Sequence, residues 1–391
     1  MRTLGALGTI MLACGLGLAQ GPAEKNTVGQ RVGRSIDSLI ADGAALSETA
    51  RSWLRSTRAK GEAELDRVIA EAKAAAPEAF VGVKVLGPGR DDPAVRWRVV
   101  GPGDALPQSL VLLVHGLHEP GGIWDEAAPS LLADGHRVAA FEYPNDQALA
   151  DSSRLLGEWL ATLRARGVTR VSIVAHSMGG LITRDVLTGK DWYAGTGSER
   201  LPEVRRIVIV STPNKGSALA HAAWLAEARE SLVRWANSEG KEWTVLLGAF
   251  KDGDGRAADD LLPDSAYLKD LNSRPLPRGV RITTIVGVLG AGAEGGLADL
   301  LDSNLGRRLL KPEDIARSKA ALIELTKDLG DGIVSERSQV LDGVEDTVRV
   351  AGNHRTVLKS FGLEQTLREK AGAERRQAPA VAVILDRLKG E

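Results

Sequence analysis

The chain has 391 residues, of which 43% are hydrophobic and 26% are charged, and its formal net charge is −1 at pH 7. These values are those of a globular protein with a sizeable core, and the length allows one large domain or two ordinary ones. Lys and Arg are spread along the sequence. The composition therefore excludes the basic footprint of a nucleic-acid-binding protein, and we expect no nucleic-acid partner.

The first residues predict a signal peptide over 1–19. A basic end is followed by an uncharged apolar stretch, and residues 17–19 have the small-residue pattern of a cleavage site. We therefore expect an exported protein, periplasmic or secreted. One alternative stays open, because residues 11–14 resemble a lipobox, and lipidation of Cys14 would anchor the protein to a membrane. Cys14 is the only cysteine, so the cleaved chain would have no disulfide.

Residues 20–80 predict a helical N-terminal extension, since apolar residues recur at helical spacing between 34 and 75. The main domain is expected over 81–391. It begins with two stretches of alternating apolar residues, 81–85 and 95–99, separated by a turn-rich segment. This pattern predicts an antiparallel hairpin at the edge of a sheet.

Continuous apolar runs then replace the alternating pattern, which is typical of strands buried on both faces. Helical stretches, such as 124–132 and 148–166, separate most of these runs. The runs lie at 110–114, 137–141, 171–174, 207–210, 282–288 and 348–350. Alternation of strands and helices predicts an α/β fold with a doubly wound, mostly parallel sheet.

The stretch 170–187, RVSIVAHSMGGLITRDVL, predicts a strand, a sharp turn and a helix, with Ser177 at the apex of the turn. Such a turn needs small residues two positions before and after the serine, and Ala175 and Gly179 satisfy this requirement. The turn exposes the hydroxyl and leaves the next backbone N–H free to bind an oxyanion. Ser177 is therefore the candidate nucleophile. The stretch AHSMGG resembles the nucleophile elbow of serine hydrolases of the α/β-hydrolase superfamily, in its lipase and esterase version.

This resemblance implies several further features. The N–H of Met178 would be the first oxyanion donor, and an HG turn after the first buried strand would supply the second from Leu117. The segment STPNKGS resembles a turn that shapes the pocket wall in lipases, with Asn214 in place of the usual histidine. The family places its cap or lid where this chain has residues 218–262. Ordinary surface helices are an equally good interpretation of that segment.

A serine nucleophile needs a base and an acid that orients the base. In this fold the acid and then the histidine follow the serine, and only His221 and His354 do so here. His221 lies in the expected cap, so His354 is the predicted base. Asp331 is the predicted acid, because DGIV resembles the acid turn of secreted lipases. Asp342, which also precedes a glycine, is the second candidate, since the connection from the strand at 282–288 to Asp331 is unusually long.

Three patterns suggest cofactors or metals but lack the required context. Residues 290–295 fit G-x-G-x-x-G, yet a helical pattern follows where a dinucleotide site needs a second strand. Residues 252–255 begin like a calcium loop, but Arg256 occupies a ligand position. His115 and His118 have no carboxylate to complete a metal site. We therefore expect neither a cofactor nor a metal.

Together these features predict a serine hydrolase that cleaves carboxylic esters, acting on an acyl-ester small molecule or a lipid, with transient contact to a lipid surface through the cap. Two alternatives remain. An acyltransferase or thioesterase would use the same triad with a different acceptor or substrate. A binding protein would keep the hydrolase fold without activity.

Overall fold

A computed structural model describes residues 81–88, 94–117, 122–193, 198–218, 256–289, 330–360 and 377–390, together with scattered positions between 37 and 67. The predicted signal peptide and nearly all of the N-terminal extension lie outside the described residues. So do residues 219–255 of the expected cap, including His221 and the calcium-like turn, and the glycine-rich stretch 290–295.

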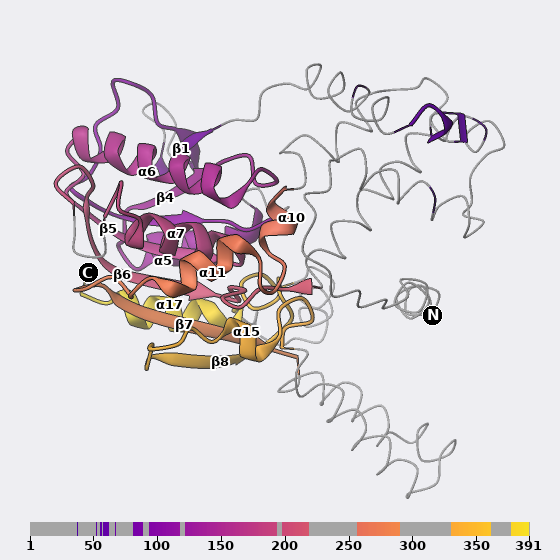
Figure 1. Cartoon of the computed structure of the whole chain (residues 1–391). Helices are drawn as coiled ribbons and strands as arrows, with labels where there is room; N and C mark the ends of the chain where they lie inside the picture. The colour runs from indigo at the N-terminus through magenta and orange to yellow at the C-terminus, as the bar shows by residue number, and fades with distance from the viewer. Residues whose placement is uncertain are drawn as a thin grey trace, which may run out of the picture.

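The described residues form an eight-stranded sheet with the strand order β2-β1-β4-β3-β5-β6-β7-β8. Strand β1 is antiparallel to both of its neighbours, and all other pairs are parallel. In Figure 1 the strands follow one another from β1 at the top to β8 at the bottom. The strands are β1 (Gly82–Pro88), β2 (Val95–Val99), β3 (Ser109–Val114), β4 (Val138–Glu142), β5 (Arg170–His176), β6 (Glu203–Val210), β7 (Arg281–Val288) and β8 (Thr347–Ala351). The predicted doubly wound, mostly parallel sheet is confirmed.

The predicted hairpin is also confirmed. Strand β1 pairs with β2, with Leu86 opposite Trp97, and β2 is the edge strand of the sheet. Val95 and Val99 on β2 are more than half exposed, as expected for one face of an edge strand. The buried strands begin only with β3, which explains why the sequence changes from alternating to continuous apolar patterns at that point.

Helices cover both faces of the sheet. One face packs against α6 (Leu149–Ala165), α7 (Met178–Thr188), α10 (Arg256–Asp260) and α11 (Ala266–Ser273). The other face packs against η1 (Gly122–Trp124), α5 (Ala127–Ala133) and α17 (Pro379–Leu388), while the short helix α15 (Glu336–Gln339) follows β7 in the chain. Because side chains alternate along a strand, β3 sends Leu112 to the first face and Leu113 to the second.

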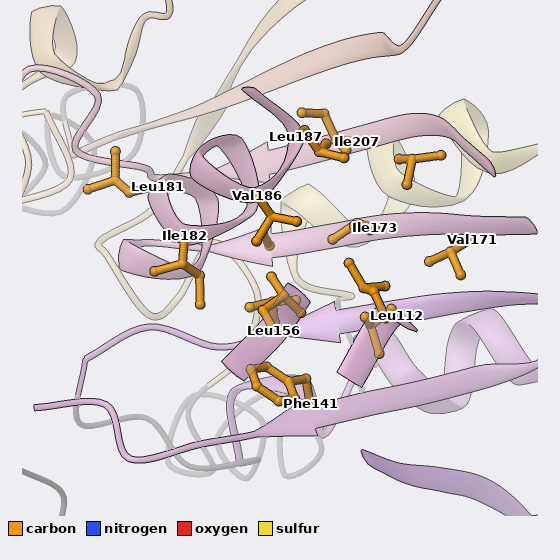
Figure 2. Packing of buried hydrophobic residues seen from close by; sticks show 14 of the residues in the cluster. Leu112, Phe141, Leu156, Val171, Ile173, Leu181, Ile182, Val186, Leu187 and Ile207 are labelled. Carbon is orange, nitrogen blue, oxygen red and sulfur yellow. The ribbon is translucent and has the colours of Figure 1, made fainter. Parts of the chain in front are cut away.

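The core between the sheet and helices α6 and α7 is built from aliphatic side chains. Figure 2 shows Leu112, Ile173 and Ile207 from three adjacent strands pointing toward Leu156 of α6 and Val186 of α7. All five side chains are buried. Burying a side chain of this kind contributes ~1.5–3 kcal/mol, so this layer holds the helix that follows Ser177 firmly against the sheet.

The chain reverses its direction across the sheet at β3. The connection from β3 leads to β4 on one side, and the next strand, β5, pairs with β3 on the other side. In open α/β sheets ligands bind at such a switch point, beside the carboxyl ends of the strands. Leu117 follows β3 and Ser177 follows β5, so both lie at this position.

The C-terminal end of the expected cap belongs to the described residues. In this part, Ala257 and Leu261 are buried in the core, and Leu261 accepts a 2.7 Å hydrogen bond from the backbone N–H of Ser217. Ser217 and Leu261, near the two ends of the expected cap, therefore lie side by side in the fold. Among the described helices, none is both long enough and apolar enough to cross a membrane.

Candidate active site

Ser177 lies in the strained turn between β5 and α7. Its backbone has φ 53° and ψ −127°, a conformation that a residue with a side chain adopts only at a cost of ~1–3 kcal/mol. The neighbouring backbones leave no space beside it, because a Cβ at Gly179 would lie 2.4 Å from the carbonyl oxygen of Val114. This close approach explains the glycine that the sequence has two residues after the serine.

The imidazole of His354 lies beside Ser177. Its Nε2 is 2.9 Å from the Ser177 Oγ, and its Nδ1 is 2.8 Å from an oxygen of Asp331. His354 follows β8 in a turn in which the side chain of Asn353 accepts hydrogen bonds from two backbone N–H groups, those of Arg355 and Thr356. The structure thus brings together the predicted nucleophile, base and acid, from three loops at the same edge of the sheet.

The carboxylate of Asp331 is fully buried, and the hydrogen bonds that it accepts favour its ionised form. One oxygen faces His354, while the other accepts hydrogen bonds of 3.0 and 2.8 Å from the backbone N–H groups of Ile333 and Val334. Burial alone would raise the pKa of Asp331, but the imidazole of His354 and these hydrogen bonds bring that pKa below its ordinary value. Asp331 is therefore ionised at neutral pH and can orient the imidazole.

Asp342, the second candidate acid, lies elsewhere. Its side chain is 80% exposed and forms a 2.8 Å ion pair with Lys215. The structure brings Asp331 to His354, and it places Asp342 in a surface turn before β8.

The two predicted oxyanion donors belong to residues near the serine: Met178 follows it in the chain, and Leu117 follows Gly116, where an added Cβ would lie 2.6 Å from the Ser177 Cβ. Met178 is the first residue of α7, where backbone N–H groups have no partner within the helix. On the other side, the Nδ1 of His115 is 2.9 Å from the carbonyl oxygen of Gly116, so Nδ1 carries the hydrogen of that bond. The same trans peptide carries the N–H of Leu117, which points away from the imidazole. The hydroxyl of Tyr143 donates to the carbonyl of His115 and holds the preceding peptide.

Two further residues, His176 and Gln339, contact the backbone of the triad loops and were not predicted from the sequence. The Nε2 of His176 is 2.8 Å from the backbone oxygen of His354, and the two imidazole rings are 4.8 Å apart. The buried amide of Gln339 bonds to the backbone next to Asp331. His176 precedes the nucleophile, which is a recognisable position. Nothing local in the sequence distinguishes Gln339, a polar residue at the end of a short helix.

Asn214, expected to shape the pocket wall, is buried in a polar network. Its side-chain oxygen accepts a 3.0 Å hydrogen bond from Arg184, and its NH₂ group donates a 2.6 Å bond to the carbonyl of Gln339. Burial lowers the pKa of Arg184 to about 10, so its guanidinium stays charged at neutral pH. Asn214 therefore braces the helix after the serine against the segment after the acid.

The described residues contain no group of three or more His, Cys, Asp or Glu side chains that could hold a metal ion. His118, the neighbour of His115 in the sequence motif, lies outside these residues.

A serine held in a tight turn between a central strand and a helix, beside a histidine that follows the last strand, defines the class of α/β hydrolases. The chain belongs to the alpha/beta hydrolase family, because that family's model matches residues 111–329, more than half of its length. None of the curated proteins matches the sequence.

Several solved structures resemble this one at low sequence identity. The mature lipase BlEst2 of Bacillus licheniformis is 18% identical, with a TM-score of 0.41, and the match covers 71% of this chain and 96% of that one. The lin2722 gene product of Listeria innocua is 14% identical, with a TM-score of 0.39, over 70% and 97% of the two chains. Lipase 1 of Pelosinus fermentans is 14% identical, with a TM-score of 0.38, over 69% and 100%.

Proposed function

We propose that this protein is a serine esterase that hydrolyses carboxylic esters through the triad Ser177, His354 and Asp331. The observation that carries the proposal is the pair of contacts made by one imidazole, 2.9 Å from the serine hydroxyl and 2.8 Å from a buried carboxylate. A serine hydroxyl becomes a nucleophile only when a base accepts its proton, and this arrangement supplies the base in the correct tautomer.

In the first half of the reaction, His354 Nε2 takes the proton of Ser177 as Oγ forms a bond to the ester carbonyl carbon. The resulting oxyanion accepts hydrogen bonds from the N–H groups of Met178 and Leu117. His354 then gives the proton to the alkoxide, which leaves as an alcohol, and an acyl-serine remains. Asp331 holds the imidazole throughout and stabilises its protonated form.

In the second half, His354 takes a proton from water, and the water oxygen attacks the acyl-serine carbonyl. Collapse of this intermediate returns the proton to Ser177 and releases the carboxylic acid. The reaction balances without a cofactor. Its substrate is an acyl-ester small molecule or lipid, and residues 218–262 are proposed to contact a lipid surface transiently.

Hydrolysis of 4-nitrophenyl esters across a series of acyl-chain lengths tests the activity. Replacing Ser177 with Ala should lower turnover by about 10⁴- to 10⁶-fold and abolish labelling by a fluorophosphonate probe. Ser211 is a matched control, because it also directly follows a strand and has a positive φ of 51°, and Ser211→Ala should still label. An unchanged rate in pure Ser177→Ala protein would overturn the proposal. Preferred transfer of the acyl group to an added alcohol would make the protein an acyltransferase.

We also propose that the protein is exported after removal of residues 1–19. The intact mass of protein secreted by an expression host should then correspond to a chain that starts near Gln20. A diacylglyceryl adduct on Cys14 would instead show a membrane-anchored lipoprotein.

A further inference from the structure

Gln339 is a buried amide in a position that the esterase mechanism does not use. It is the last residue of the four-residue helix α15, and it has no exposed surface. All three polar positions of its side chain are paired. Its oxygen accepts from the backbone N–H of Gly287 at 2.7 Å, and its NH₂ group donates at 2.9 Å to the carbonyl oxygens of both Gly287 and Val334.

These bonds connect a strand to the turn that holds Asp331. Gly287 is the second-last residue of β7, and the side chain of Gln339 pairs with both of its backbone groups as a neighbouring strand would. Val334 closes the acid turn from the other side. Its N–H donates to the Asp331 carboxylate at 2.8 Å, and its carbonyl accepts from the Asp331 N–H at 3.2 Å.

The acid itself packs on the same strand position. A Cβ added to Gly287 would lie 3.0 Å from the Asp331 Cβ, so the backbone of β7 and the side chain of Asp331 are in direct contact there. The backbone of Gln339 is itself fixed, because its carbonyl oxygen accepts a 2.6 Å hydrogen bond from the side chain of Asn214. The acid turn therefore cannot move away from β7 without breaking the bonds of Gln339.

We infer that Gln339 is a positioning residue of the proposed esterase, whose amide clamps the Asp331–Val334 turn to strand β7 and so sets the geometry between Asp331 and His354. The inference rests on the proposed function for its kinetic consequence only. Loss of this clamp, the hydrogen bonds of the Gln339 amide, should lower turnover, because displacing a catalytic group by ~1 Å can lower the rate by ~10²-fold. Loss of the clamp should also change the pKa of His354, because the nearby Asp331 carboxylate stabilises the imidazolium.

Gln339→Met tests the inference, because methionine has a similar length and cannot form these bonds. The wild-type protein and the variant are compared by kcat and KM for a short 4-nitrophenyl ester and by the His354 pKa from NMR titration. We expect kcat to fall by about tenfold with KM within about twofold. We expect the His354 pKa to fall by about 0.5 or more, because the imidazolium loses part of its carboxylate contact. The imidazole of His176 also faces His354, so the NMR signals of the two histidines are assigned separately before the titration.

Ser338→Ala is the matched control. Ser338 is the adjacent residue of the same helix and is also buried, but its hydroxyl bonds to Gly216 and Lys215 and not to the acid turn. This variant should lose a comparable amount of stability while keeping the wild-type kcat and His354 pKa. Gln339→Asn retains an amide that is one methylene shorter, and it should change both values in the same direction as Gln339→Met but less. If Gln339→Met does not fold, the same measurements are made on Gln339→Asn.

The outcomes separate the two proposals. If the wild-type protein is inactive on every ester while Gln339→Met lowers the His354 pKa, the clamp stands and the esterase proposal fails. An unchanged His354 pKa in both Gln339 variants overturns the clamp, whatever the activity. Equal changes in Ser338→Ala and Gln339→Met would likewise overturn it, since they would show a general loss of packing.

Discussion

The backbone N–H of Leu289 donates a 2.7 Å hydrogen bond to the carbonyl oxygen of Gly330, although residues 290–329 lie between them in the chain. Leu289 directly follows β7, and Gly330 directly precedes Asp331. The acid therefore follows β7 immediately in space. The long connection that made Asp331 uncertain from the sequence therefore does not separate the acid from the end of β7.

We therefore expect residues 290–329 to be dispensable for assembling the triad. A variant in which a short Gly-Ser linker joins Leu289 to Gly330 should fold, because closing a shorter loop costs less entropy. It should still label with a fluorophosphonate probe. Gly330→Ala is the contrasting variant, because its Cβ would lie 2.0 Å from the Val334 carbonyl oxygen and should disrupt the acid turn. A soluble, folded deletion variant that does not label would contradict this expectation.

The contacts of the two candidate acids predict opposite mutational effects. Asp331→Asn should lower turnover by up to ~10⁴-fold without unfolding, because it removes the group that fixes the imidazole tautomer and stabilises the imidazolium. Asp342→Asn should leave turnover within about twofold, because an exposed ion pair such as that with Lys215 contributes only ~0–1 kcal/mol. Both variants are measured with the same ester at the same pH. A severe effect of Asp342→Asn combined with a mild effect of Asp331→Asn would show that the acid is misassigned.

The lowered pKa of Asp331 predicts a specific dependence of stability on pH. Because the folded-state pKa lies below the ordinary value of 3.8, the ionised carboxylate contributes stability that is fully present above about pH 4. That contribution is lost as the pH falls through the folded-state pKa. The Tm of the wild type relative to that of Asp331→Asn should therefore fall as the pH drops below about 4. Thermal unfolding followed by circular dichroism measures it. A constant difference down to pH 3 would be inconsistent with the buried, ionised carboxylate.

The contact between Gly116 and the serine predicts a large effect from a single methyl group. A Cβ at Gly116 would lie 2.6 Å from the Ser177 Cβ and 3.1 Å from its Oγ. Gly116→Ala should therefore displace either the serine or the turn that carries Leu117 and lower kcat by about 10²-fold. Gly87→Ala is the control, because a Cβ at Gly87 has nothing within 4 Å. Wild-type turnover in folded Gly116→Ala protein would show that the turn is not packed against Ser177.

The sequence by itself determined the sheet and the serine turn of this protein. Continuous apolar runs separated by helical stretches depend on local periodicity, and strands β3 to β8 lie where these runs predict them. The turn at Ser177 is equally local, because its strain and close backbone approach require small residues at fixed spacing. The cap, the signal peptide and the catalytic roles of the triad residues stay predictions.

Only the tertiary structure decided which aspartate meets His354. Asp331 and Asp342 both precede a glycine, so local sequence does not separate them, and their positions depend on how the chain returns to β7 and β8. The same holds for Gln339, whose partners Gly287 and Val334 lie on two separate elements. Hydrogen bonds between segments that are distant in the chain depend on the order and register of the strands. A periodic pattern contains no information about such contacts, because it records only which face of its own element each residue occupies.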